Sequence, residues 1–117
     1  MPRTLLIVDD SRLARTLVRR YATQACADLA VHEAADASEA LVLSEATAFD
    51  VMTVDFNMPG LNGLELARRL HRRQPAARIT LLTANVQAAV RERAAAAGIG
   101  FIAKPITATA IAEFVER

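Results

Sequence analysis

Five polar side chains stand at the ends of short apolar runs in this sequence, and together they could perform phosphoryl chemistry. Asp9 and Asp10 follow the first apolar run, and Asp55 ends the third. Thr83 ends the fourth run, and Lys104 follows the fifth. Clustered carboxylates repel one another unless a cation joins them, and oxygen ligands of this kind suit Mg²⁺. A carboxylate can also be the nucleophile that forms an aspartyl phosphate. An ammonium and a hydroxyl beside it would neutralise the charge on a transferring phosphoryl group.

Five apolar runs of strand length alternate with helical patterns, at residues 4–8, 30–34, 51–54, 79–82 and 101–103. This alternation predicts a doubly wound α/β fold, in which a five-stranded parallel sheet carries helices on both faces. The polar His32 and Glu33 indicate that the second run lies at a sheet edge. Parallel sheets place their active groups beyond the carboxyl ends of the strands. A single aspartate there is explained by turn or cap formation, whereas five convergent polar groups indicate a site.

Local signals predict where the intervening helices lie. The first helix is predicted from apolar residues at helical spacing, namely Leu13, Leu17, Val18 and Tyr21. Asp36 and Glu39 form a capping-box pattern at the start of the second helix, and Asn62 begins the third by a similar signal. The alanine-rich segment 86–97 predicts the fourth helix and is followed by glycine. The last helix is expected within residues 106–115.

Length and composition favour one soluble, cytoplasmic domain over residues 1–117. With 53% hydrophobic and 23% charged residues, the chain does not have the composition of a disordered protein. Its net charge of +1 argues against direct nucleic-acid binding. The four arginines within residues 68–73 are interpreted as a solvated face or a kinase contact. A lone Cys26 excludes an internal disulfide, and no apolar run is long enough to span a membrane.

The polar residues and their neighbours resemble the receiver domain of two-component response regulators, and within it the single-domain CheY-like proteins. Four segments carry the resemblance, Val-Asp-Asp-Ser at 8–11, Asp-Phe-Asn-Met-Pro-Gly at 55–60, Leu-Thr-Ala at 82–84 and Phe-Ile-Ala-Lys-Pro at 101–105. They occur in the order of the family, and the resemblance extends from Leu5 to Val115. It implies a CheY-like, flavodoxin-like (βα)5 fold with the strand order 2-1-3-4-5.

The resemblance implies a role in phosphorylation for five residues. Asp55 would accept a phosphoryl group from a histidine kinase or a histidine phosphotransfer protein. Asp9 and Asp10 would hold Mg²⁺, together with Asp55 and the backbone carbonyl of Asn57. Lys104 would pair with the phosphoryl oxygens. The domain would then be a signalling protein rather than an enzyme, limited to its own phosphorylation and slow dephosphorylation.

The resemblance also implies a conformational switch. The hydroxyl of Thr83 would move onto the phosphoryl group, and Phe101, where the family has a rotating aromatic residue, would turn inward. Ala84 would leave room beside the phosphoryl group, and Pro105 would follow a cis peptide bond. The surface made by the fourth helix, fifth strand and fifth helix would then control a downstream protein or the chain's own effector domain. A dimer that forms on phosphorylation is a further expected partner state.

Two further positions tune the phosphoryl lifetime in this family, the second residue after the acceptor and the second after the switch threonine. Here they are Asn57 and Asn85. Neither amide can deprotonate an attacking water, so we expect a moderate lifetime, between seconds and hours.

The residues leave several other interpretations to be weighed. Haloacid-dehalogenase-like phosphatases also form an aspartyl phosphate, but they place an Asp-x-Asp pair after the first strand, where this chain has adjacent aspartates. A nucleotide- or flavin-binding protein is disfavoured because no glycine-rich loop follows the first run. An unphosphorylated receiver-like scaffold remains an alternative, as does a receiver fragment of a larger regulator whose effector domain is missing.

Overall fold

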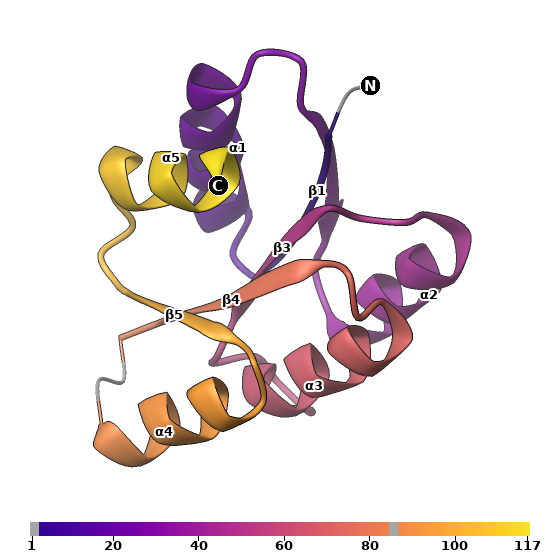
Figure 1. Ribbon diagram of the computed structural model, residues 1–117, viewed down its shortest axis with the longest axis vertical. Helices are drawn as coiled ribbons and strands as arrows, with labels where there is room; N and C mark the ends of the chain where they lie inside the picture. Colours follow the sequence, from indigo (N-terminus) through magenta and orange to yellow (C-terminus); the bar gives the residue numbers. More distant parts are fainter. Residues whose placement is uncertain (1–2, 85–86) are drawn as a thin grey trace.

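The computed structural model describes residues 3–84 and 87–117, in which five strands alternate with five helices (Figure 1). The strands are β1 (Thr4–Val8), β2 (Ala30–Ala34), β3 (Val51–Asp55), β4 (Arg78–Thr83) and β5 (Gly100–Ala103). The helices are α1 (Arg12–Ala25), α2 (Ala37–Ala46), α3 (Gly63–Arg73), α4 (Ala88–Ala96) and α5 (Ala108–Glu116). Among the described residues, no helix is both long and apolar enough to cross a membrane.

All neighbouring strands pair in parallel, in the order β2-β1-β3-β4-β5. The predicted doubly wound sheet and its strand order are therefore confirmed, and β2 lies at one edge as its polar residues indicated. After β2 the chain returns to the other side of β1 and adds β3, β4 and β5 there. The direction of winding reverses between β1 and β3. The carboxyl ends of these two strands therefore flank the crevice where parallel α/β sheets place their ligands.

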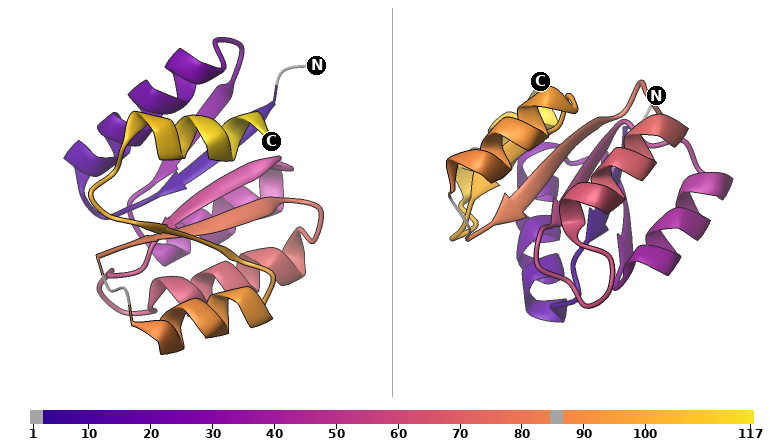
Figure 2. Two further views of the ribbon diagram at one scale, coloured as in Figure 1. Left: turned by 60° about the vertical axis from the view of Figure 1, so that its left-hand side comes forward. Right: turned by 90° about the horizontal axis from the view of Figure 1, so that it is seen from below.

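Helices cover both faces of the sheet, with α1 and α5 on one face and α2, α3 and α4 on the other (Figures 1 and 2). The side chains of β1 alternate between these layers. Leu5 and Ile7 belong to the core beneath α1 and α5, whereas Leu6 and Val8 belong to the core beneath the other three helices. Because side chains alternate across a strand and both faces are covered, a continuous apolar run is the expected pattern for such a strand.

Side-chain caps set where four of the helices begin, and in α5 the cap is Thr107, which accepts the N–H of Ala110 at 3.2 Å. The carboxylate of Asp36 accepts the N–H of Glu39 at 2.8 Å, as the capping-box pattern predicted. The Glu39 carboxylate accepts the N–H of Ala35 at 2.7 Å, one residue earlier than in the usual box. At the start of α3, Asn62 accepts the N–H of Glu65 at 2.9 Å. In α1 the cap is Ser11.

Two predictions about the helices need correction. Leu13 was expected on the buried face of α1, but it is 79% exposed. The fully buried residues of this helix are Val18 and Ala22, four positions apart, and Leu13 lies about 140° around the helix from Val18. The fourth helix was expected over 86–97, but α4 covers Ala88–Ala96. The first residue of that expected range lies outside the described residues.

Candidate functional site

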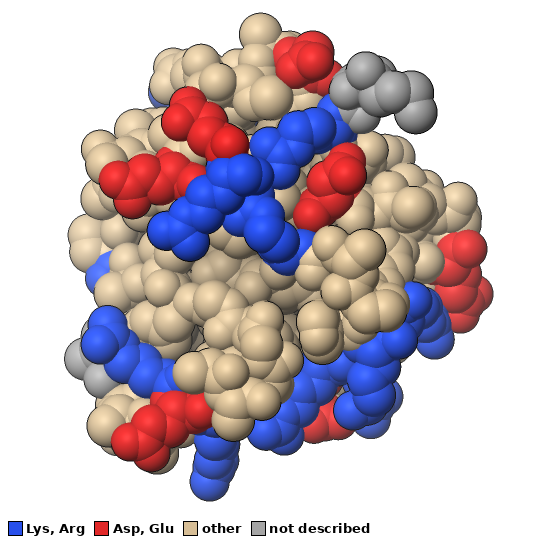
Figure 3. Space-filling view, in the orientation of Figure 1, with Lys and Arg blue, Asp and Glu red and all other residues tan. Residues whose placement is uncertain are grey.

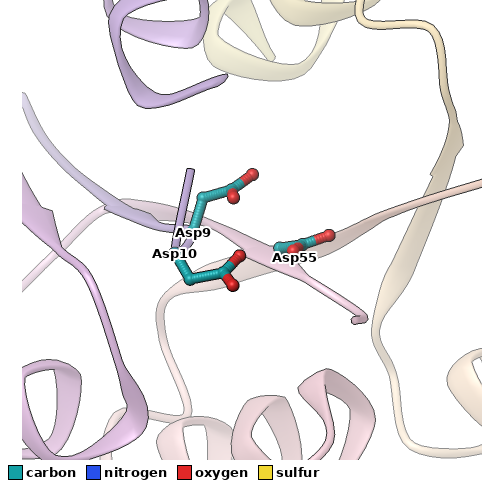
Figure 4. Close-up of side chains that lie close together, drawn as sticks. All are labelled: Asp9, Asp10 and Asp55. Carbon is teal, nitrogen blue, oxygen red and sulfur yellow. The ribbon is translucent and has the colours of Figure 1, made fainter. Parts of the chain in front are cut away.

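Three aspartates meet at the carboxyl ends of β1 and β3. The register pairs Val8 with Val54, so the residues that follow them, Asp9 and Asp55, are brought side by side. Asp10 comes next in the chain. Each of the three carboxylates offers an oxygen atom within 4.8 Å of the others (Figure 4). The sheet register therefore assembles the acidic cluster that the strand-end pattern predicted.

The two carboxylate oxygens of Asp9 have different surroundings. Its side chain is buried, with only 1% of the residue exposed. Oδ1 accepts the backbone N–H of Ser11 at 2.9 Å. Oδ2 is buried and has no hydrogen-bond partner among the described residues, although Lys104 Nζ lies 4.0 Å away. A buried carboxylate oxygen without a partner is energetically costly, and a cation beside it would remove that cost.

The loop from β1 to α1 leaves the aspartates available for chemistry. The hydroxyl of Ser11 caps α1 by accepting the N–H of Ala14 at 3.2 Å. The guanidinium of Arg15 donates to the backbone carbonyl of Asp9 at 2.7 Å. Helix capping therefore falls to Ser11, and the carboxylates of Asp9 and Asp10 are not used for it.

Lys104 reaches the cluster from the far side of β4. Its Nζ lies 3.0 Å from Oδ1 of Asp55, and its backbone N–H donates to the carbonyl of Thr83 at 2.8 Å. Thr83 is fully buried at the end of β4, the strand between β3 and β5. The peptide bond from Lys104 to Pro105 is cis. The lysine therefore holds the carboxylate that was predicted to be the phosphoacceptor.

The electrostatics of the cluster favour an added cation. Burial raises the pKa of Asp9 above its ordinary value, and the negative charges of Asp55 and Asp10 act in the same direction. The N–H of Ser11 and the ammonium of Lys104 oppose this shift. Lys104 thus pairs with two of the three carboxylates, those of Asp55 and Asp9, and among the described residues the buried Oδ2 of Asp9 is without a hydrogen bond. A donor set made only of oxygens suits a hard divalent cation such as Mg²⁺ or Ca²⁺. The acidic cluster can therefore bind a divalent metal.

Gly63 positions the site, and the sequence analysis missed it. It is the first residue of α3, and its N–H donates to the carbonyl of Phe56 at 2.9 Å. A Cβ at this position would lie 2.2 Å from the backbone oxygen of Asp55 and 2.6 Å from Cα of Phe56. Only glycine allows α3 to approach β3 so closely. The available signal was a glycine directly after the cap residue Asn62.

The other predicted site residues lie around this rim. Ala84 is exposed directly after Thr83, and Asn57 is exposed in the loop that follows β3. Phe101 is half-buried in β5, where the guanidinium of Arg91 lies 4.9 Å from the centre of its ring. The last predicted site residue, Asn85, lies outside the described residues. The structure therefore joins Asp9 and Asp55 to Lys104, with Asp10 in the same acidic cluster. Thr83 lies at the same end of the sheet, and Phe101 lies earlier along β5.

Comparison with known proteins gives a consistent family assignment. A family model described as "Response regulator receiver domain" matches residues 5–116. The cyclic di-GMP phosphodiesterase response regulator RpfG of Xanthomonas campestris is 41% identical over 106 residues, which are 87% of this chain and 28% of that protein. The transcriptional activator protein ExaE of Pseudomonas putida is 30% identical over 114 residues, which are 97% of this chain and 53% of that protein. The chain therefore spans between about a quarter and a half of these relatives.

Solved structures agree with this assignment. The chemotaxis protein CheY4 of Vibrio cholerae has a TM-score of 0.89 and 28% identity, and the match covers 100% of this chain and 98% of that one. A response regulator of Burkholderia pseudomallei, solved with a phosphorylated aspartic acid, a calcium ion and citrate, has a TM-score of 0.86 and 30% identity. That match covers 97% of this chain and 66% of the other.

Proposed function

The chain belongs to the family of response regulator receiver domains, and on this premise we propose that it is a phosphorylation-controlled switch whose phosphoacceptor is Asp55. Receiver domains are signalling domains of two-component systems. The observation that carries the proposal is the pairing of the buried Asp55 carboxylate with Lys104 Nζ, at 3.0 Å, beside a buried Asp9 oxygen for which the described part of the chain offers no hydrogen-bond partner. This arrangement combines a nucleophile, a fixed positive charge and an oxygen ligand at one end of the sheet.

In the proposed reaction, Asp55 takes a phosphoryl group from the phosphohistidine of a histidine kinase or a histidine phosphotransfer protein. A carboxylate oxygen of Asp55 attacks phosphorus as the P–N bond to the imidazole breaks, and the departing imidazole nitrogen takes up a proton. Lys104 would move from the carboxylate to the phosphoryl oxygens and neutralise part of their charge. The chain itself would contribute positioning and charge to its own phosphorylation, and it would not turn over a separate substrate.

The acidic cluster would hold Mg²⁺ through Asp9, Asp10 and Asp55, with the backbone carbonyl of Asn57 as a further ligand. The orphaned Oδ2 of Asp9 and the all-oxygen donor set fit such an ion. When bound, Mg²⁺ would supply positive charge against the equatorial phosphoryl oxygens. The neighbouring structure from Burkholderia pseudomallei contains a calcium ion, which likewise prefers oxygen ligands.

Phosphorylation would act through a shift between two packings of the same chain. The hydroxyl of Thr83 would contact the phosphoryl group beside the small Ala84, and Phe101 would leave its place under Arg91 and turn inward. The surface formed by α4, β5 and α5 would then bind a downstream protein, an attached effector domain or a second copy of the chain. With amides at positions 57 and 85, the proposed phosphoryl lifetime is moderate.

We further propose that residues 1–117 act as one receiver domain. An unphosphorylated scaffold is the alternative within the same family. A receiver that works as part of a longer regulator is the other alternative, since the matched relatives are longer than this chain.

The test is incubation with acetyl phosphate and Mg²⁺ followed by intact mass measurement. Wild-type chain is expected to gain one phosphoryl group, about 80 Da, and to gain none when the metal is chelated. Asp55→Asn is expected to gain none under either condition. Asp28→Asn is the matched control, because it makes the same chemical change at an exposed residue outside the acidic cluster.

Two results would overturn the proposal. If the wild-type chain takes up no phosphoryl group, the scaffold alternative replaces the switch. If Asp55→Asn is modified as fully as wild type, the acceptor is a different residue and the assignment of Asp55 is wrong.

A further inference from the structure

A second charged surface lies on α3, away from the acidic cluster. Four arginines occur within six residues of this helix, at Arg68, Arg69, Arg72 and Arg73. Figure 3 shows Lys and Arg side chains forming a band over the region where Figure 1 draws α2 and α3. Their positive charges lie close together, and the chain's own carboxylates, the solvent or a partner can balance them.

The chain balances this band only in part. The carboxylate of Glu65 is shared between Arg68 at 3.9 Å and Arg69 at 3.5 Å. Glu45 pairs with Arg73 at 3.2 Å. In the part of the chain that the structure describes, Arg72 has no ion pair. Four guanidinium groups therefore face two carboxylates, and this surface keeps an excess of positive charge that suits an anionic partner.

The band borders a shallow, open groove. Its volume is about 420 Å³, and Leu41 of α2 and Arg69, Arg72 and Arg73 of α3 line it. Arg73 joins the two helices, because its Nη1 donates to the carbonyl of Leu41 at 3.0 Å and to Oγ of Ser44 at 3.3 Å. We call this feature the basic groove. These contacts hold the Arg73 side of the groove before any partner arrives.

The basic groove has apolar surface beside its charges. Leu41 is half-buried and lines the groove. Val42, the next residue of α2, is 64% exposed and is one of only two large apolar residues reported as exposed among the described residues. A partner that neutralised the arginines could therefore also cover aliphatic surface. This combination is more typical of a protein-binding surface than of a solvated helix face.

We propose that the basic groove docks an acidic amphipathic helix of a partner protein, with two carboxylates one helical turn apart and an apolar side chain between them. Arg69 and Arg72 are three positions apart and lie one above the other on α3. Carboxylates spaced by one turn on a partner helix match this separation. The apolar side chain would cover Leu41. This docking goes beyond the proposed phosphorylation switch and does not depend on Asp55.

A protein partner fits the charges better than nucleic acid or a membrane does. Glu45 is exposed at 66% of its side chain and Glu65 at 35%, and both lie among the arginines. A nucleic-acid backbone carries a charge about every 1.7 Å along its axis, so it would also bring phosphates against these two carboxylates. An anionic lipid surface would do the same. A helix with two placed carboxylates would contact the arginines without bringing negative charge against Glu45 and Glu65.

The test measures binding of a helical peptide of about 18 residues to the ¹⁵N-labelled full chain. The peptide carries Glu at positions i and i+4 and Leu at i+3, and a control peptide carries Gln in place of both Glu residues. The groove variant is Arg69→Gln with Arg72→Gln, which leaves the structural contacts of Arg73 intact. The matched control is Arg20→Gln with Arg93→Gln, which removes the same charge from exposed positions on α1 and α4. Thermal unfolding of both variants checks that they fold.

Amide shifts confined to α2 and α3 are expected, with affinity at least about tenfold weaker for the groove variant and for the Gln peptide. The control variant and Asp55→Asn are expected to bind within about twofold of wild type. Asp55→Asn is expected to abolish phosphorylation and to leave peptide binding intact. The two proposals can therefore fail independently of each other, and this variant shows which one has failed.

Several outcomes would overturn the docking proposal. Failure of the Glu peptide to bind even at millimolar concentration would be one such outcome. A second is an equal loss of peptide affinity in the groove variant and in the control variant, and a third is a set of amide shifts centred outside α2 and α3. Duplex DNA or phosphatidylserine vesicles are tested in parallel. If either binds more tightly than the peptide and depends on Arg69 and Arg72, the partner belongs to that class and not to proteins.

Discussion

Substituting Gly63 by alanine tests whether the close approach of α3 to β3 positions the phosphoacceptor. The added Cβ would lie 2.2 Å from the backbone oxygen of Asp55, 2.8 Å from its carbonyl carbon and 2.6 Å from Cα of Phe56. All three are backbone atoms at the end of a central strand, so no side chain can rotate away. The start of α3 or the end of β3 must move by about 1 Å to restore normal van der Waals separation.

The expected change in the free energy of unfolding follows from two opposing effects of Gly63→Ala. Overpacking against a fixed backbone costs about 1–3 kcal/mol or somewhat more. Alanine is favoured over glycine inside a helix by about 1 kcal/mol, which offsets part of that cost. We expect Gly63→Ala to lower the free energy of unfolding by about 2 kcal/mol, because three backbone contacts are involved at once. For a domain of this size, that corresponds to a fall in Tm of about 6–10 °C.

Gly60→Ala is the matched control in the same loop. Gly60 has a φ of +85°, and a Cβ there would meet nothing within 4 Å. Its substitution therefore costs only the left-handed backbone conformation, about 1 kcal/mol. Urea unfolding at neutral pH compares the two variants, and phosphoryl uptake from acetyl phosphate is timed for each. We expect uptake to slow several-fold in Gly63→Ala and to change little in Gly60→Ala, because only the former displaces the backbone of Asp55.

The reasoning would be refuted by a Gly63→Ala chain that is as stable as wild type and takes up phosphate at the same rate. A chain of increased stability would show that the helix propensity of alanine outweighs the steric contact. Equal effects in both variants would show that loss of glycine in this loop matters, and that the contact with Asp55 does not.

Three further predictions concern other parts of the molecule. Partial burial alone would raise the pKa of Glu33, but hydrogen bonds and ion pairs with Arg19 and Arg15 lower it below its ordinary value. This stabilisation is therefore present at pH 7 and is lost as the pH falls through the lowered pKa. Glu33→Gln should cost about 0.5–1 kcal/mol at pH 7, and urea unfolding should show the difference from wild type vanishing in acid. Asp36→Ala removes the cap of α2 and should cost about 1 kcal/mol, measured by thermal unfolding; an unchanged Tm would contradict it. Mg²⁺ at ten times its dissociation constant should stabilise the chain by about 1.4 kcal/mol. Asp10→Asn should be stabilised less by the same Mg²⁺ concentration, and if it is stabilised more than wild type, Asp10 does not belong to the metal site.

Much of the fold and the chemical identity of the site are determined by the sequence alone. Continuous apolar runs covered on both faces predict a parallel sheet, because strands buried on both sides need no polar alternation. Asp9, Asp55 and Lys104 could be assigned to one rim because each lies at the end of such a run. The cap at Asp36 could be predicted because it depends on side chains only three positions apart.

The tertiary structure alone decided which atoms of these residues are free to act. Among the residues that the structure describes, Oδ2 of Asp9 has no hydrogen-bond partner, whereas Oδ1 accepts the N–H of Ser11; this difference depends on how the chain leaves β1. Lys104 reaches Asp55 across β4, and no spacing along the chain specifies that distance. The same holds for Gly63, where no side chain fits because the backbone at the end of β3 lies too close.

The surface was the least predictable part, because it too depends on how separate elements pack together. Helical periodicity groups Leu13 with the apolar residues of α1, yet Leu13 is 79% exposed because it lies about 140° around the helix from the buried Val18. The arginines of α3 are visible in the sequence, but the basic groove also needs Leu41 of α2, whose carbonyl accepts a hydrogen bond from Arg73. Residue types and short-range spacing specify the elements and their chemistry. The distances between elements, set by register and packing, decide which of those groups meet.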